Sequence, residues 1–411
     1  MNVYRNVFRT WLSAGALSIL LGACGGGSED ASSAGGGNDT GGATGASRFS
    51  QSVQWTVEVP AQGEAVCFDF DTGTQNADCT GASWDLMLAT PAGGRGGVPS
   101  LFTNSGVSGS GRGGAYLGPF DHTWEQLQAF VDATHDPEMG GAELPAQVYS
   151  ADRMDSAFAG DNMIGSAIFE YALGGEDHYL YPNMRTVLIE ADGTVYALQV
   201  TGYYGGADGT TSGHPAFRWI DRTHGAAVRE AQVDASRGTA YFNLQTGQQV
   251  ADASGNWHIA FYRYNVQLNG GDSGTGGVRG AAGPVPDGLY DGDGQPVNDA
   301  FRDANLGAYA LALLSSAPVP AADARDWKTD AKSSVLNPAW RRAQGDFDFG
   351  WYRYSMQNHM LTATPENGSL VRGGEGNSYA RVHLTEIRYA DPSDANSRQT
   401  WTLAMDVQPA Q

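Results

Sequence analysis

Four residues of the chain resemble the nucleophile segment of chymotrypsin-type serine proteases. Residues 271–274 read Gly-Asp-Ser-Gly. Such a serine works only with a histidine that takes its proton and a carboxylate that orients the histidine. No Ala-Ala-His-Cys segment precedes the motif, and the similar stretch at 106–109 reads Gly-Val-Ser-Gly, without the aspartate. We therefore expect neither a protease nor another enzyme.

Other patterns for catalysis or ion binding are incomplete. Residues 291–294, Asp-Gly-Asp-Gly, lack the third ligand and the closing glutamate of a calcium loop, which predicts an acidic turn. The sequence has no His-Glu-x-x-His motif, no P-loop and no dinucleotide fingerprint. The Gly-rich loops 104–114 and 269–277 could hold an anion through backbone amides, but flexible connections are the simpler interpretation. These patterns favour a binding protein.

The first cysteine lies in a sequence typical of lipoproteins. A positively charged start and a short apolar run predict a secretory signal peptide over 1–23. The run ends in Leu-Gly-Ala-Cys at 21–24, a lipobox, so we expect lipid on Cys24. Ordinary cleavage near Ala23 is the alternative. Gly25 replaces the aspartate of the inner-membrane retention signal, which favours the outer membrane, with the lipid anchor as the only membrane contact.

The segment behind the lipobox and the other two cysteines fit an exported protein. Residues 24–47 are rich in Gly and Ser and predict a flexible tether. Export implies an oxidising compartment, in which Cys67 and Cys79 could form a disulfide across a hairpin. Two buried free thiols are the alternative.

Composition limits the fold and the partners. The 411 residues carry a formal net charge of −21, which argues against a nucleic-acid partner and against a polybasic membrane-surface domain. The 57 glycines and the 10% aromatic residues are typical of short strands joined by tight turns. We therefore expect an all-β protein with a minor helix.

An internal repeat organises the chain. Three segments of the first half recur in the same order in the second: 68–73 with 242–247, 84–88 with 257–261, and 104–111 with 269–276. Tyr171 and His178 then match Tyr352 and His359 at the same spacing of seven. The repeat predicts two tandem homologous domains, 48–224 and 225–411, each long enough to fold alone.

Periodicity predicts several elements. Residues 257–264 alternate as a strand, and residues 186–201 read as a hairpin with its turn at Asp192 and Gly193. Residues 123–133 read as a helix that begins with a capping box of Thr123 and Gln126. Its expected apolar stripe consists of Trp124, Leu127, Phe130 and Val131. Trp84 and Trp257 are expected in the core.

The motifs, taken in order, resemble those of the HmuY family of haem-binding lipoproteins. The shared features are the aromatic-x-Leu-x-Thr-Gly turn, the Trp-initiated strand, the Asn-Gly-Gly-x-Ser-Gly-x-Gly loop, and a histidine ahead of a Val-rich hairpin. The likeness is greatest over residues 241–277. It implies an all-β fold, haem as cofactor, capture of haem from host haemoproteins, and delivery to a TonB-dependent outer-membrane receptor.

The resemblance also points to ligands for haem iron. A haem carrier uses two axial ligands, typically His with His or Met. His178 and His359 match each other in the repeat and precede the hairpin where the family has an axial histidine. In the first domain the second ligand would be His122, His135 or Met154. The second domain lacks an equivalent histidine, so its second ligand would come from another chain or from the following set: His258, Met356 and His383.

Each of these assignments has a simpler alternative. A histidine at a strand edge is often only a surface residue, and His258 can be a packed strand histidine. The competing function is that of a surface lipoprotein that uses the same fold without haem and binds a protein or a glycan through exposed aromatic side chains.

The lipobox generates the first prediction. Cys24→Ser removes the thiol that would carry the lipid, so the protein should move from the membrane fraction to the soluble fraction. Cell fractionation with immunoblotting measures this. Continued outer-membrane fractionation of the variant would argue against an anchor at Cys24.

Overall fold

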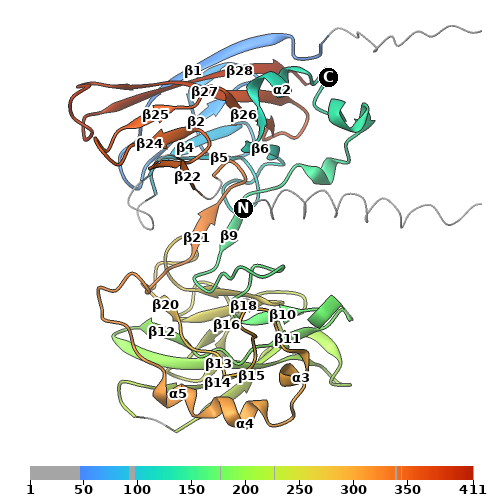
Figure 1. Ribbon diagram of the computed structural model, residues 1–411, viewed down its shortest axis with the longest axis vertical. Helices are drawn as coiled ribbons and strands as arrows, with labels where there is room; N and C mark the ends of the chain where they lie inside the picture. Colours follow the sequence, from blue (N-terminus) through green and yellow to red (C-terminus); the bar gives the residue numbers. More distant parts are fainter. Residues whose placement is uncertain are drawn as a thin grey trace, which may run out of the picture. The chain divides into compact units, whose positions relative to one another are not determined.

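The computed structural model describes residues 47–91, 98–175, 177–225, 227–337, 340–343 and 345–410 (Figure 1). The expected signal peptide, Cys24 and nearly all of the expected tether lie outside these residues. Within them, no helix is long and apolar enough to cross a membrane. The described chain consists mostly of antiparallel strands with a few short helices, which confirms the all-β prediction.

The strands form two lobes. The two ends of the described chain, residues 47–152 and 334–410, form one lobe, which we call the outer lobe. The middle of the chain, residues 157–330, forms the other, which we call the inner lobe. The strands β9 (Arg153–Asp155) and β21 (Ala331–Ser333) connect the lobes and pair with each other as antiparallel neighbours (Figure 1).

Three larger sheets build the outer lobe. The first has the order β1 (Gln51–Glu58), β28 (Gln399–Gln408), β27 (Tyr379–Tyr389), β26 (Asn367–Arg372) and β6 (Gly114–Thr123). The second has the order β3 (Thr74–Ala77), β2 (Ala65–Asp69), β4 (Leu86–Ala89) and β5 (Ser100–Thr103). The third has the order β22 (Arg341–Ala343), β23 (Asp346–Asp348), β24 (Tyr352–Tyr354) and β25 (Leu361–Ala363). The strands β7 (His135–Asp136) and β8 (Ala142–Glu143) and the helix α2 (Trp124–Gln128) complete it.

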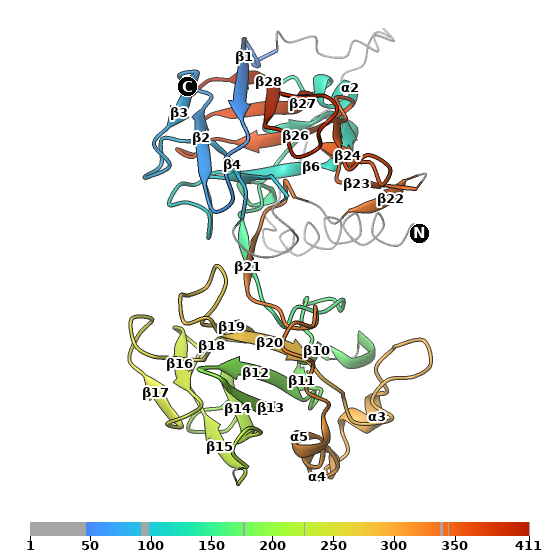
Figure 2. The same ribbon diagram turned by 90° about the vertical axis from the view of Figure 1, so that its left-hand side faces the viewer.

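The inner lobe repeats the first two of these sheets (Figure 2). One has the order β15 (Arg229–Gln232), β14 (Thr211–Asp221), β13 (Thr194–Gly205), β12 (Val187–Ala191) and β20 (Arg279–Ala282). The other has the order β17 (Gln248–Val250), β16 (Ala240–Asn243), β18 (Ile259–Tyr262) and β19 (Asn265–Leu268). The hairpin β10 (Phe169–Tyr171) and β11 (Leu180–Pro182) and the helices α3 (Asn298–Phe301), α4 (Leu306–Leu311) and α5 (Leu313–Ser316) complete it.

Each lobe has its own aromatic core, which its two large sheets supply together. In the outer lobe Trp55 stacks on Phe68, and both are fully buried with Trp401. In the inner lobe Phe217 contacts both Phe242 and Phe261. Buried apolar area of this kind is the main stabilising contribution to a fold. Trp84 and Trp257 are both buried, as the sequence predicts.

The strand pairing does not follow the expected tandem division at residues 224 and 225. Strand β1 of the first repeat pairs with β28 of the second, and β6 pairs with β26. Conversely, β12 of the first repeat pairs with β20 of the second, and β14 pairs with β15. Each lobe therefore consists of the first part of one repeat and the last part of the other, an arrangement that we call the exchange of halves. Because the repeats are similar, either one offers equivalent hydrogen-bonding edges, and β9 and β21 lead the chain from one lobe to the other.

A shared irregularity shows that the exchanged strands occupy equivalent places. In the inner lobe a register shift separates Val200 from Gly202 on β13. In the outer lobe a register shift separates Leu384 from Glu386 on β27. The residues opposite Gly202 and Glu386 are Ala216 and Thr402, respectively. Such bulges are specific features of a sheet, so Ala216 and Thr402 hold the same position in the two lobes.

The Gly-rich loops fold around asparagine side chains and are not open connections. Asn104 donates to the carbonyl of Trp84 and accepts from the amide of Gly111. Asn269 makes the same pair of bonds with Trp257 and Gly276. A Cβ atom at Gly109 would lie 2.1 Å from the Asn104 Oδ1 atom, so only glycine fits there. The repeated Asn-to-Gly spacing is therefore a packing motif.

Several predicted elements are present with different limits. The hairpin β12–β13 and the capping box of Thr123 and Gln126 are confirmed. The helix is wrong in length, because it ends at Gln128. Beyond Gln128 the chain takes a non-helical course in which Phe130 is buried in the core. Val131, which was expected in the same apolar stripe, is 41% exposed. The predicted strand 257–264 is likewise limited to β18, since the chain turns at Arg263, which has a φ of 53°.

The exchange of halves can be tested with paired cysteines. Thr56 and Thr402 lie opposite each other, and their hydroxyl oxygens are 3.5 Å apart. Thr56→Cys with Thr402→Cys should therefore form a disulfide on mild oxidation. Thr56→Cys with Ala216→Cys, the equivalent pair within the first repeat, should not. Peptide mapping under non-reducing conditions measures both, and the reverse result would mean that each repeat closes on itself.

Candidate functional site

Two histidines sit on equivalent hairpins, each held by a tyrosine. The Tyr171 hydroxyl lies 2.9 Å from His178 Nδ1, next to the hairpin β10–β11. The Tyr354 hydroxyl lies 2.5 Å from His359 Nδ1, next to the hairpin β24–β25. Both imidazole rings are exposed. The structure thus places the two histidines in matching surroundings, one in each lobe.

The tyrosine partner in the second repeat differs from the sequence match. Tyr171 lies opposite Leu180, and Tyr354 lies opposite Leu361, so Tyr354 is the counterpart of Tyr171. Tyr352, which the sequence spacing indicates, is instead buried and donates its hydroxyl to the carbonyl of Pro99. Spacing alone misleads here because His359 follows its strand two residues sooner than His178 does.

A hydrogen bond at Nδ1 decides what the other ring nitrogen can do. When the imidazole Nδ1–H donates to the tyrosine oxygen, Nε2 carries the free lone pair that a metal ion requires. The turn that carries His359 is also conformationally unusual, because His359 has a φ of 61°. A non-glycine residue in this left-handed region costs conformational energy and often marks a functional position. Chemically, each pair can present one oriented imidazole nitrogen to a ligand.

The exchange of halves changes which candidate ligands share a lobe. His122 and His135, expected as partners of His178, lie in the outer lobe with His359. Met154 lies on β9, opposite Lys332, between the lobes. The inner lobe keeps His178 without any of these three expected partners.

His122 is a largely buried histidine whose ring nitrogens have no hydrogen bond to the described residues. It lies on β6 opposite Gly368, and its side chain is 12% exposed. Neither ring nitrogen makes a hydrogen bond to the described residues, although Nε2 is 3.5 Å from a carboxylate oxygen of Glu138. The ring meets Phe130 edge to face. Such a nitrogen remains available to a bound partner.

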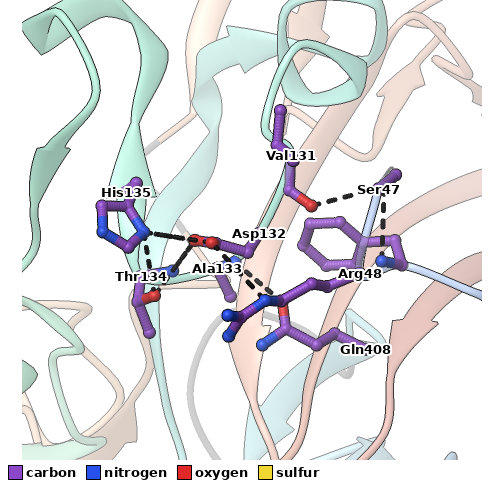
Figure 3. A network of polar contacts seen from close by, with 9 residues as sticks. Ser47, Arg48, Val131, Asp132, Ala133, Thr134, His135 and Gln408 are labelled. Carbon is purple, nitrogen blue, oxygen red and sulfur yellow. Dashed lines mark hydrogen bonds and ion pairs between the residues drawn. The ribbon is translucent and has the colours of Figure 1, made fainter. Parts of the chain in front are cut away.

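His135 is held by its neighbour Asp132 (Figure 3). Its Nδ1 atom lies 2.8 Å from Asp132 Oδ1, and the backbone amide of Thr134 donates to the same carboxylate oxygen. Burial raises the pKa of Asp132, but the hydrogen bonds from His135 and Thr134 outweigh it, so the pKa is lowered. The Arg48 Nε atom lies 3.9 Å from the other carboxylate oxygen, Oδ2. The ionised carboxylate orients the ring and leaves Nε2 free of this contact.

Two of the remaining candidate ligands, His383 and His258, pack against other residues of the protein. His383 stacks on Trp124 with ring centroids 3.8 Å apart, and its Nδ1–H donates to the carbonyl of Pro365. His258 is buried with Nε2 3.4 Å from Asp192, and desolvation lowers its pKa. Met356 is 48% exposed, three residues before His359.

A disulfide and an acidic cluster lie at the second sheet of the outer lobe, on and next to β2. Cys67 and Cys79 form a disulfide with their Cα atoms 5.4 Å apart. Carboxylate oxygens of Asp69, Asp71 and Asp85 lie within 4.8 Å of one another. Asp85 is 1% exposed and accepts the backbone amides of two separate loops, so it joins them.

Sequence reasoning missed a cavity in the inner lobe. It measures about 690 Å³ and lies among β11, β14, β15 and the segment between α3 and α4. Its lining includes Tyr181, Met184, Phe301 and Arg218, of which Arg218 is 7% exposed and donates to the carbonyl of Gly307. The lining residues come from both repeats, so no local motif could have indicated the cavity. No histidine is among its lining residues, which distinguishes it from the histidine hairpins.

Asp85 generates a prediction about stability. Burial is the main cause that raises its pKa from 3.8 to about 7. The folded state then holds a proton that the unfolded state has lost, so stability should fall as pH rises from about 4 to 7, by about 1.4 kcal/mol per pH unit. Asp85→Asn should remove this slope, whereas the exposed control Asp161→Asn should keep it. Urea unfolding at pH 5 and pH 7 measures the difference, and an unchanged slope in Asp85→Asn would contradict the assignment.

Comparison with known proteins gives one family. Residues 236–403 match the family model described as HmuY protein. Among solved structures, the apo HmuY analogue of Tannerella forsythia is similar at 14% identity, over 41% of this chain and 88% of that chain, with a TM-score of 0.12. A TM-score this low supports no argument. The comparison with curated proteins gave no match. Residues 236–403, which include His359, are thus similar to the HmuY family.

Proposed function

We propose that the protein is a haem-binding, or more generally porphyrin-binding, surface lipoprotein that acts in haem and iron acquisition. The observation that carries the proposal is the Tyr354–His359 pair, which lies inside the matched residues and orients an exposed imidazole. The lipid anchor at Cys24, the outer-membrane location and a TonB-dependent receptor as the partner belong to the same proposal. They rest on the lipobox and on the resemblance.

The donor set of the outer lobe fits haem iron. His and Met are the usual axial ligands of a carrier that leaves no open position. The outer lobe contains His359 together with His122, His135 and Met356. His122 has no hydrogen bond to the described residues at either ring nitrogen, and His135 has only its Nδ1 atom held by Asp132. We therefore assign His359 as one ligand and one of these three residues as the other.

The inner lobe is the weaker candidate. His178 has the same tyrosine support as His359, but His122 and His135 belong to the other lobe. The other histidines in this part of the described chain are His214, His224 and His258. His224 is held by Asp221, and His214 Nδ1 contacts the Thr211 carbonyl. The ring nitrogens of His258 have no hydrogen bond to the described residues, but His258 is only 1% exposed, against 12% for the side chain of His122. Haem ligation through two histidines therefore has more support in the outer lobe.

The residues of the protein would have separate roles. His359 and its partner would bind the iron, which supplies the coordination chemistry when haem is bound. Tyr354 would hold His359 in one orientation through Nδ1, as the hydrogen-bonding partners of metal-ligating histidines usually do. Asp132 would do the same for His135.

Haemin titration tests this assignment. Wild-type protein should give a sharp low-spin Soret band, and His359→Ala should convert it to a high-spin band. Binding should weaken about tenfold or more, since loss of a residue that only orients a metal ligand already costs about 10- to 100-fold. His178→Ala, the same change in the other lobe, is the matched control and should leave the spectrum close to wild type. If only His178→Ala alters the spectrum, the site lies in the inner lobe. If wild type leaves the haemin spectrum unchanged, the haem proposal falls and the non-haem interaction protein replaces it.

A further inference from the structure

The cavity of the inner lobe lies between its five-stranded sheet and the helices α3 and α4 (Figure 1). The sheet contributes residues of three neighbouring strands, among them Thr201 on β13, Ala216 and Arg218 on β14, and Glu230 and Gln232 on β15. Glu230 lies opposite Arg218, and Gln232 lies opposite Ala216. At about 690 Å³ the cavity falls within the range of roughly 300 to 1,000 Å³ that is typical of small-molecule sites.

A buried cation without a counter-ion lines this cavity. Arg218 is 7% exposed, and none of the ion pairs among the described residues includes it. Its Nε atom donates to the side-chain oxygen of Gln199, and Nη2 donates to the carbonyl of Gly307. Both acceptors are uncharged, and Nη1 makes no hydrogen bond to the described residues. A buried charge of this kind is costly until an opposite charge meets it.

Burial lowers the pKa of the Arg218 guanidinium, and the carboxylate of Glu230 offsets only part of that effect. The guanidinium nevertheless stays protonated, because an arginine side chain does not lose its proton in proteins. The cation is therefore permanent, and an anion inside the cavity would stabilise it at every physiological pH.

The outer lobe fills the equivalent place with its own side chains. Arg218 lies opposite Gln199, and the corresponding pair beside the shared bulge of the outer lobe is Ala404 opposite His383. Trp124 of α2 stacks on His383 with ring centroids 3.8 Å apart. The same sheet is thus built without a cation at this position, so Arg218 is not a requirement of the fold. Its presence in the inner lobe indicates a role in the cavity.

The other charges of the cavity limit the ligand to one negative charge. Glu230 and Asp303 also line the cavity, but both are exposed. Water and salt screen exposed charges much more than buried ones. The buried Arg218 therefore decides the sign of the group that it meets, while the two carboxylates disfavour a second negative charge on the same ligand.

Apolar side chains supply the second kind of contact. Phe301 and Leu306 are both 7% exposed and line the cavity together with Met184. We propose that this cavity binds a small monocarboxylate with an apolar body, such as a medium-chain fatty acid. Its carboxylate meets Arg218, whose planar guanidinium suits a carboxylate, and its body lies against the apolar side chains. The proposal does not depend on haem, since no histidine is among the lining residues.

Octanoate is the probe, and isothermal titration calorimetry measures its binding. The full chain is used as the Cys24→Ser variant, so that neither a covalent acyl chain nor detergent competes with the probe. Octanoate should bind, whereas 1-octanol and octylammonium, which have the same apolar body without a negative charge, should bind roughly tenfold more weakly or less tightly still. Arg218→Gln should weaken octanoate binding roughly tenfold, the effect of losing one charge-assisted hydrogen-bonding partner, and should leave 1-octanol binding unchanged.

Glu230→Gln tests the sign of the charge without touching a buried group. It removes a repelling carboxylate from the lining, so octanoate should bind roughly two- to fivefold more tightly, the range expected for an exposed charge. Glu64→Gln, the same change at an exposed glutamate of the outer lobe, is the matched control and should bind like wild type.

A change of volume covers the case in which Arg218→Gln does not fold, since Arg218 also holds Gln199 and Gly307. Ala216→Leu adds bulk to the lining and should weaken the binding of octanoate and 1-octanol alike. Far-UV circular dichroism and thermal unfolding of each variant show whether it is folded.

Three results would overturn the proposal. They are the absence of octanoate binding to the wild-type cavity, tighter binding of octylammonium than of octanoate, and wild-type octanoate binding by folded Ala216→Leu. Haemin titration of the same variants keeps this test separate from the proposed function, because Ala216→Leu and Glu230→Gln should leave the haemin spectrum unchanged. If octanoate binding follows these expectations while haemin gives no ligated spectrum, the carboxylate site stands and only the haem proposal falls.

Discussion

Two buried aspartates fix the segments through which the chain passes between its lobes. Asp152 accepts hydrogen bonds from the amide and hydroxyl of Thr103. Asp330 accepts the amides of Ala157 and Leu268. Burial raises the pKa of both carboxyls, and the hydrogen bonds offset part of that cost. The two aspartates stand at equivalent points, immediately before β9 and β21, and the remaining topology depends on where those strands lead.

The sequence repeat and the structural lobe are therefore different units. The HmuY family model matches residues 236–403 as one continuous stretch. In the structure, residues up to 330 of that stretch belong to the inner lobe and those from 334 belong to the outer lobe. Each lobe has the same two large sheets in the same strand order, assembled from the first part of one repeat and the last part of the other. An exchange between similar repeats preserves every type of contact while it changes which residues share a site.

Local features could be predicted from sequence, and partner choice could not. The Asp192 turn, the Thr123 capping box and the buried Trp84 and Trp257 follow from side-chain chemistry within a few residues. The partner of β1 does not, because β14 and β28 occupy equivalent places in the two five-stranded sheets and each offers an antiparallel edge. The helix after Thr123 is shorter than its apolar pattern indicates, since Phe130 is needed in the core. The tertiary structure, and not local propensity, decides such limits.

The candidate site shows the same contrast between local features, which the sequence predicts, and the choice of partners, which it does not. Sequence reasoning paired His178 with His122, His135 or Met154, because all four belong to the first repeat, and it could identify candidate residues but not which of them lie in the same lobe. The exchange places His122 and His135 with His359 instead. The additional strands β22 and β23 lie in the same lobe, so Arg342 and Phe347 share a face with Tyr354, which holds His359. Two similar repeats thus give lobes with different residues around matching histidines: the outer lobe contains His122 and His135 with His359, whereas the inner lobe contains His178 and His258 and a cavity whose lining residues include no histidine. The residues of the second repeat between His258 and His359 contain no histidine, so that repeat has no counterpart of His122 and His135.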